Sequence, residues 1–173
     1  MKKLGCDYQR ILIIGSGGSG KSTLTEKLSP LTNLPAVHLD ALYWRENWQH
    51  VETEEFDRLL EAQLSKEKWI LDGNFNRTLE MRLKSADFVI YLDFPAPICV
   101  WGVIKRVLRY HGNTRPDMGK GCPEKFDLTF LKWVAGFRKK YREKYLALLS
   151  ESGKDYIVLK SRRELGRFLK DYL

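Results

Sequence analysis

The segment from Gly15 to Ser22, GSGGSGKS, constrains the fold of this chain more than any other feature. It matches the pattern G-x-x-x-x-G-K-S, follows an apolar run over residues 11–14 and opens a stretch with helical periodicity over residues 21–28. Glycines allow backbone N–H groups to turn inward around phosphate oxygens, and the N-terminus of a following helix adds a dipole that favours anions. The segment therefore predicts a buried strand, a phosphate-binding loop and a helix in direct succession.

The residue types inside this loop indicate a nucleoside triphosphate as the ligand. Lys21 can reach the β- and γ-phosphates, and the hydroxyl of Ser22 can ligate Mg²⁺. We therefore predict ATP and Mg²⁺ as cofactors, with Ser22 as a metal ligand and Lys21 as a catalytic residue. The predicted ATP-binding residues are Gly15, Ser16, Gly17, Gly18, Ser19, Gly20, Lys21, Ser22 and Thr23.

Length and composition fit one globular domain that spans residues 1–173. The chain is 43% hydrophobic, which suffices for a core without disulfides. Its longest apolar run, residues 96–104, is far too short for a membrane span, so we expect no membrane partner. The three cysteines are widely spaced and form no C-x-x-C pair, which indicates free thiols and a cytoplasmic location.

Five short apolar segments alternate with helix-length segments, a pattern typical of βαβ units and a parallel sheet. The predicted strands cover residues 10–14, 36–39, 69–71, 88–92 and 156–159. The predicted helices cover residues 21–28, 54–64, 97–110, 127–149 and 162–172. The sequence thus predicts an α/β fold.

A long segment between two predicted helices, residues 110–125, is rich in glycine and proline and predicts an active-site lid. Arg106, Arg109, Arg115 and Arg138 bracket it, and planar guanidinium groups suit the oxygens of a phosphoryl group in transit. We predict a catalytic role for these four arginines. We also expect the like charges of this segment to displace it from the site when no ligand is bound.

The formal net charge is +8, and the excess is concentrated between residues 103 and 144. Such a charge favours anionic partners, whether nucleotides or nucleic acid. This basic segment is either a clamp over a triphosphate or a solvated cationic face.

Carboxylates follow the second and third predicted strands, where ligands bind in parallel sheets. Asp72 can support Mg²⁺ opposite Ser22, or it can cap the next turn. Asp40 can take a proton from a substrate hydroxyl or hold a ribose hydroxyl, or it can be a turn residue. The nearby Trp44 and Trp48 either stack on a base or pack a helix onto the sheet. The histidines share no ligand spacing, so we interpret His38, His50 and His111 as structural or solvated.

Together these segments resemble the adenylate-kinase-like nucleotide kinases, in particular the small bacterial topology modulation proteins. The resemblance covers nearly the whole chain and rests on the phosphate loop, ILDGNFNRT at 70–78, ADFVIYLD at 86–93, HLDALYW at 38–44 and the arginine-bracketed lid. It implies a three-layer α/β/α P-loop NTPase fold whose five-stranded parallel sheet has the order 2-3-1-4-5. In adenylate kinases a D-G-F-P-R segment supplies an Asp for Mg²⁺ and an Arg for the acceptor phosphate. Here Asp72 and Gly73 match, and one extra residue precedes Arg77.

These features lead us to expect an ATP-dependent phosphotransferase that transfers the γ-phosphoryl group to a small nucleotide or nucleoside-like acceptor. A small-alcohol kinase of the shikimate or gluconate type is an alternative, because Asp40 could serve as its base. A DNA-binding regulatory protein that modulates DNA topology is a third, favoured by the pI near 9.4 and by the basic run over residues 132–144. The sequence leaves the acceptor and the oligomeric state open.

Overall fold

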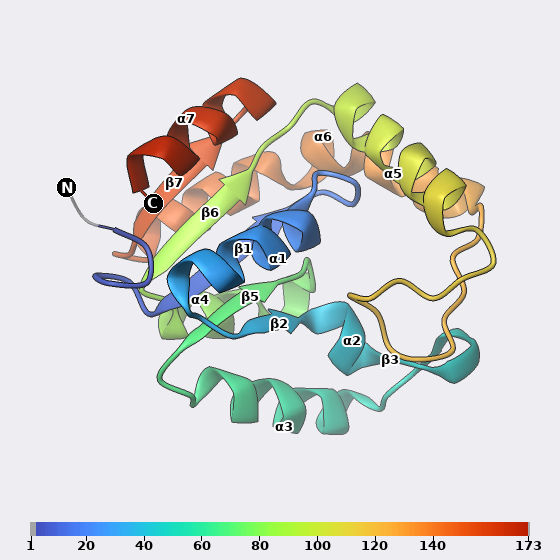
Figure 1. Cartoon of the computed structure of the whole chain (residues 1–173), viewed down its shortest axis with the longest axis horizontal. Coiled ribbons are helices and arrows are strands. Elements are labelled where there is room, and N and C mark those ends of the chain that lie inside the picture. Colours follow the sequence, from blue (N-terminus) through green and yellow to red (C-terminus); the bar gives the residue numbers. More distant parts are fainter. Residues whose placement is uncertain (1–2, 173) are drawn as a thin grey trace.

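The five predicted strands form a parallel sheet in the order β2-β5-β1-β6-β7, within the residues 3–172 that the computed structural model describes (Figure 1). They are β1 (Arg10–Gly15), β2 (Ala36–His38), β5 (Trp69–Asp72), β6 (Phe88–Leu92) and β7 (Asp155–Leu159). Counted among themselves, they have the expected order 2-3-1-4-5. The labels of the later strands do not follow this count, because two further strands lie between β2 and β5 in the chain. The sequence did not indicate these two strands, which form a separate antiparallel pair. This pair consists of β3 (Trp44–Arg45) and β4 (Gln49–His50).

Local sequence signals account for the helix boundaries. Pro97 lies in the first turn of one helix, and the Asp127 side chain accepts hydrogen bonds from two N–H groups at the start of another. The helices are α1 (Lys21–Thr32), α2 (Leu39–Tyr43), α3 (Thr53–Leu64), α4 (Leu79–Ser85), α5 (Ala96–Tyr110), α6 (Leu128–Glu151) and α7 (Arg162–Tyr172), with short 3₁₀ turns η1 (Glu46–Trp48) and η2 (Asn76–Thr78). The five predicted helices are confirmed. The sequence missed α2 and α4 because elements of five and seven residues are too short for a clear period.

Helices cover both faces of the sheet, which confirms the predicted three layers (Figure 1). Along β1, Ile11 and Ile13 join a core with side chains of α1, α5 and α7. The alternate residues Leu12 and Ile14 join a second core with side chains of α3, α4 and α6. Because both faces are buried, β1 and β6 consist of almost continuous apolar residues.

Residues 110–125, the lid segment, lie against the β3–β4 hairpin (Figure 1). The backbone N–H of Asn47 donates to the carbonyl of Gly121 at 2.8 Å, and the Trp48 indole N–H donates to the carbonyl of Pro123 at 3.0 Å. Met118 and Cys122 are buried there. In this structure the segment is packed against the hairpin, and a set of ion pairs described below holds it there; its displacement without a ligand stays a prediction.

Two further predictions from the sequence concern the cysteines and the membrane-spanning helices. Cys6, Cys99 and Cys122 are free thiols, as the sequence indicates. Within residues 3–172, no helix combines the length and the hydropathy that a membrane crossing requires.

Candidate active site

The phosphate loop connects β1 to α1, and its glycines have the backbone conformations that such a loop needs. Gly20 has φ +95° and begins α1 without a side-chain cap. A methyl group built on Gly20 would contact no atom within 4 Å, so the space in front of the helix is open. The first N–H groups of α1 can therefore donate to an anion such as a phosphate.

Close packing against α5 fixes the other side of the loop. Gly18 has φ +71°, and a Cβ there would lie 2.1 Å from the carbonyl oxygen of Cys99. A Cβ on Gly102 would lie 2.1 Å from the carbonyl oxygen of Gly18. Two glycines thus let the loop and α5 touch backbone to backbone. This contact also sets the position of Arg106, one turn further along α5.

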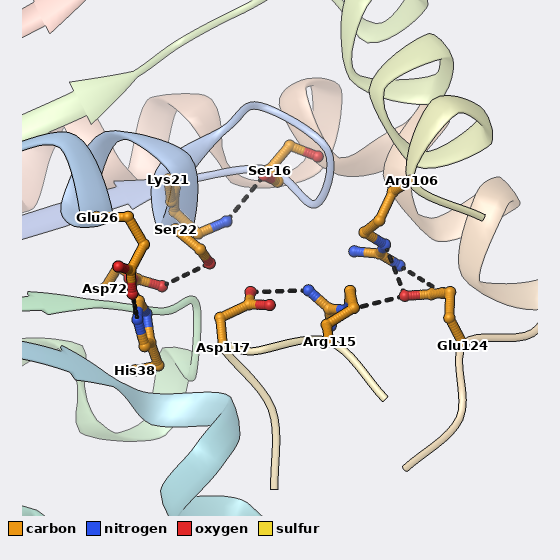
Figure 2. Close-up of polar contacts among 10 residues, drawn as sticks. All are labelled: Ser16, Lys21, Ser22, Glu26, His38, Asp72, Arg106, Arg115, Asp117 and Glu124. Carbon is orange, nitrogen blue, oxygen red and sulfur yellow. Dashed lines mark hydrogen bonds and ion pairs between the residues drawn. The ribbon is translucent and has the colours of Figure 1, made fainter. Parts of the chain in front are cut away.

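Lys21 curls back over the loop, where its Nζ donates to the carbonyl of Ser16 at 2.9 Å (Figure 2). Burial lowers the pKa of Lys21, while the carboxylates of Asp72 and Asp40 oppose that effect. A cation in this place can replace its backbone contact with the oxygens of a triphosphate.

A hydrogen-bonded chain runs from the loop to the outside of the molecule (Figure 2). The Ser22 hydroxyl donates to Asp72 at 3.2 Å, Asp72 contacts Nδ1 of His38 at 2.6 Å, and Nε2 of His38 contacts Glu26 at 2.7 Å. Burial disfavours the charged imidazole, but the hydrogen bonds and charges of Asp72 and Glu26 outweigh it and raise the pKa of His38 to about 9. At neutral pH His38 is therefore an imidazolium that balances Asp72.

We interpreted His38 as structural or solvated, and the sequence did not indicate its contact with Asp72. The residue ends β2 and stands opposite Asp72 in the register of β2 and β5. The available signal was its place at the carboxyl end of a strand, two residues before Asp40.

Ser22 and Asp72 fit the magnesium site that the sequence predicts. Mg²⁺ prefers oxygen ligands, keeps several waters and takes few ligands from the protein when phosphates are present. One hydroxyl and one carboxylate 3.2 Å apart, at the open end of the loop, match that requirement. Among residues 3–172 no group of three or more His, Cys, Asp or Glu residues could hold a metal by itself. A metal here would thus depend on phosphate oxygens.

Two arginines from different segments meet at one buried carboxylate (Figure 2). Nε of Arg106, on α5, lies 3.0 Å from Glu124, and Nε of Arg115, in the lid segment, lies 2.8 Å from the same carboxylate oxygen. Arg115 also contacts Asp117 at 2.8 Å. These carboxylates neutralise the repulsion that we expected to displace the lid segment, and they hold Arg115 and Asp117 opposite Lys21.

The other two predicted arginines do not join this cluster, so the four-arginine bracket is assembled only in part. The guanidinium of Arg109 is exposed and lies over the ring of Tyr110, 5.2 Å from its centroid. Arg138 and Arg142 both contact the buried Asp93, each at 2.8 Å. Sequence spacing places an arginine near the lid segment, but the rotation of α6 decides which carboxylate it meets.

Asp40 lies in the first turn of α2, directly after β2. Burial raises the pKa of Asp40, and the charges of Arg115 and Lys21 counteract that rise. The carboxylate is thus within the electrostatic field of both the phosphate loop and the lid segment. A group so placed can accept a proton from a hydroxyl that faces the loop.

Two further residues from the sequence analysis have other contacts. Trp48 packs edge-on against Trp44 of β3, with ring centroids 5.5 Å apart, and its indole N–H donates to the lid segment; stacking of either ring on a base stays a prediction. Arg77 forms a two-fold ion pair with Asp57, at 2.9 and 2.6 Å. The guanidinium of Arg77 is therefore already paired with a carboxylate.

No protein-family model and no curated protein matches this chain. Solved structures do match it in fold. Shikimate kinase from Acinetobacter baumannii, in complex with shikimate, is similar with a TM-score of 0.57 and 15% identity over 95% of both chains. Shikimate kinase from Bacteroides thetaiotaomicron is similar with a TM-score of 0.56 and 15% identity, also over 95% of both. The chain has the α/β fold of these P-loop kinases.

Proposed function

We propose that this chain is an ATP-dependent kinase that phosphorylates a hydroxyl group of a small, nucleoside-like acceptor. The observation that carries the proposal is the position of Asp40. The charges of Lys21 in the phosphate loop and of Arg115 in the lid segment both act on this carboxylate. A carboxylate of raised pKa beside a phosphate loop suits a general base for an alcohol.

Different residues of the chain would have different roles in such a phosphoryl transfer. The loop N–H groups and Lys21 bind the β- and γ-phosphates, while Arg106 and Arg115 balance charge on the transferring group. Mg²⁺, when bound, neutralises phosphate charge; Ser22, and Asp72 through water, would hold it. The acceptor oxygen forms a bond to the γ-phosphorus as the bond to the β–γ bridging oxygen breaks. That electron pair leaves with ADP, and the hydroxyl proton passes to Asp40.

The alternative of a topology modulation protein that acts on DNA depends on the basic face of α6. Two of its arginines, Arg138 and Arg142, are engaged by Asp93. The exposed lysines of the run over residues 132–144 remain available to an anionic surface. This alternative predicts that duplex DNA binds at micromolar affinity or better at physiological salt, with a steep dependence on salt concentration.

The test is release of ADP from Mg·ATP in the presence of nucleosides, nucleotides and small polyols. We expect acceptor-dependent release, and Asp40→Asn should reduce its rate by about 10²–10⁴ with little change in ATP affinity. The matched control is Asp171→Asn, an exposed residue of α7. An unchanged rate in Asp40→Asn would refute the general base. Binding of duplex DNA by a protein that does not bind ATP would favour the DNA alternative instead.

A further inference from the structure

A small aromatic cavity is formed by α2, α3 and the loop that follows β5. It has a volume of about 140 Å³ and is lined by Tyr43, Thr53, Phe56, Phe75, Asn76 and Arg77. The rings of Tyr43 and Phe75 have centroids 4.7 Å apart, and Phe56 lies 5.2 Å from Tyr43 and 4.9 Å from Phe75. An apolar cavity of about 150 Å³ holds one benzene ring. This cavity therefore has the size and the lining for a single planar ring.

The walls of the cavity come from the segments that carry Asp40 and Asp72. Tyr43 is three residues after Asp40 on α2, so the two side chains share a face of that helix. Phe75 is three residues after Asp72, in the loop that follows β5. A ring bound against the exposed side of this aromatic cluster would thus lie next to the segments that carry Asp40 and Asp72.

A buried arginine shapes the wall formed by that loop. The guanidinium of Arg82 is fully buried and donates to the carbonyls of Gly73 at 3.0 Å, Phe75 at 2.6 Å and Thr78 at 3.3 Å. Burial lowers the pKa of Arg82 to about 10. Three backbone carbonyls held by one side chain fix the path of the loop, so this wall of the cavity exists before any ligand binds.

The charges at the mouth of the cavity cancel. Arg77 is the single cation among the lining residues, and Asp57 contacts it through two hydrogen bonds of 2.6 and 2.9 Å. Hydrogen bonding to Arg77 lowers the pKa of Asp57, so that carboxylate is ionised at neutral pH. An anionic acceptor would have to displace Asp57 from Arg77 and would meet its negative charge. An uncharged acceptor meets neither obstacle.

We propose that this cavity binds the acceptor, and that the acceptor is an uncharged hydroxyl compound with one planar ring rather than a phosphorylated or carboxylated one. The proposal rests on the kinase function proposed above. Asp57 acts as a specificity determinant, because it occupies the cation that an anionic acceptor would need. Pyrimidine nucleosides and benzyl alcohols belong to the class of compounds that fit.

The experiment compares acceptors that keep the same hydroxyl groups and differ by one carboxylate: uridine with 5-carboxyuridine, and benzyl alcohol with 4-(hydroxymethyl)benzoate. For the wild-type protein with Mg·ATP, kcat/KM for ADP release should be at least about 10-fold higher with each neutral member. Asp57→Asn frees Arg77 and should raise kcat/KM for the anionic members by about 10-fold or more. The neutral members should stay within about twofold, since no charge of theirs meets residue 57.

The matched control is Glu55→Gln, which breaks the exposed ion pair with Arg45 at 3.0 Å, outside the cavity. Glu55→Gln should leave kcat/KM unchanged for both the neutral and the anionic acceptors. A second variant, Arg77→Gln, removes the cation and should not gain activity with the anionic acceptors, unlike Asp57→Asn. A wild-type preference for the anionic members, or an Asp57→Asn protein without any gain for them, would overturn the proposal.

Calorimetric titration separates this proposal from the kinase function, because binding does not require turnover. If no acceptor releases ADP but the neutral ring compounds bind, with affinity lost in Phe75→Ala, the kinase function fails and the ring site stands. If ADP is released with acceptors that lack a ring, and Phe75→Ala does not alter their kcat/KM, the kinase function stands and the ring site fails.

Discussion

Glu124 is the residue on which the closed lid segment depends, and Glu124→Gln should loosen that segment. The Glu124 carboxylate is 3% exposed and contacts Arg106 at 3.0 Å and Arg115 at 2.8 Å. Glutamine has nearly the same shape but no charge. The two guanidinium groups would then face one another across a neutral amide, and their mutual repulsion would favour opening.

The free-energy cost of Glu124→Gln depends on how deeply the ion pairs are buried and on the hydrogen bond that the glutamine amide still accepts. Removal of one partner from a buried ion pair destabilises by about 3–5 kcal/mol. Water reaches the Arg106 side chain, which is 22% exposed, and the glutamine oxygen still accepts a hydrogen bond, so we expect the lower end, about 3 kcal/mol. The loss concerns the lid segment rather than the sheet. It should therefore make local opening about 100-fold more frequent.

Amide hydrogen exchange over residues 111–125, with and without Mg·ATP, measures this opening. Exchange should be about 100-fold faster in Glu124→Gln and unchanged in the control Glu67→Gln, which alters an exposed carboxylate away from the lid segment. Mg·ATP should restore protection, because the triphosphate supplies negative charge to the same guanidinium groups. Unchanged exchange in Glu124→Gln would refute the idea that these ion pairs hold the segment. Faster exchange that Mg·ATP does not slow would refute the placement of the arginines at the triphosphate.

Three further predictions use other residues. Lys21→Ala should lower ATP affinity by about 30-fold or more, because a charge-assisted contact contributes about 2–3 kcal/mol. Titration with a non-hydrolysable ATP analogue measures this affinity, and a change below about threefold would contradict the prediction. Gly18→Ala should lower the free energy of unfolding in urea by about 2–4 kcal/mol, because its Cβ would clash with α5. Gly20→Ala, also at positive φ but without a clash, should lower it by only about 1 kcal/mol. Equal losses would refute the packing argument. Burial opposes ionisation of Asp93, but hydrogen bonds from Arg138 and a neighbouring arginine lower its pKa. The wild type should therefore be more stable than Asp93→Asn above about pH 4 and should lose that advantage as the pH falls through the lowered pKa. A difference in the free energy of urea unfolding that stays constant from about pH 7 to about pH 2 would contradict this prediction.

The local elements of this fold could be predicted because their causes are local. Gly18 and Gly20 provide backbone conformations that few other residues adopt, and Lys21 and Ser22 follow them at fixed positions. The run FVIYL of β6 is apolar at every position because helices cover both faces of a parallel sheet. Patterns of this kind need no knowledge of distant residues, so the strands, the longer helices and the phosphate loop were all recognisable.

Pairings between distant residues depended on the tertiary structure. His38 meets Asp72 only because β2 lies beside β5 in one register, and that register is invisible in the sequence near either residue. Arg138 could have faced the lid segment or Asp93, since both lie many residues away along the chain. The packing of α6 chose Asp93.

The lid segment shows the same division most clearly. Its composition predicts an irregular loop, and its basic residues alone suggest repulsion. Whether those charges repel or attract depends on which carboxylate lies within about 3 Å of which guanidinium, and Coulomb energy falls with distance and with solvent exposure. Folding brings Glu124 between Arg106 and Arg115 and buries it. The sequence determined how much charge this segment carries, and only the tertiary structure decided which charges are neighbours.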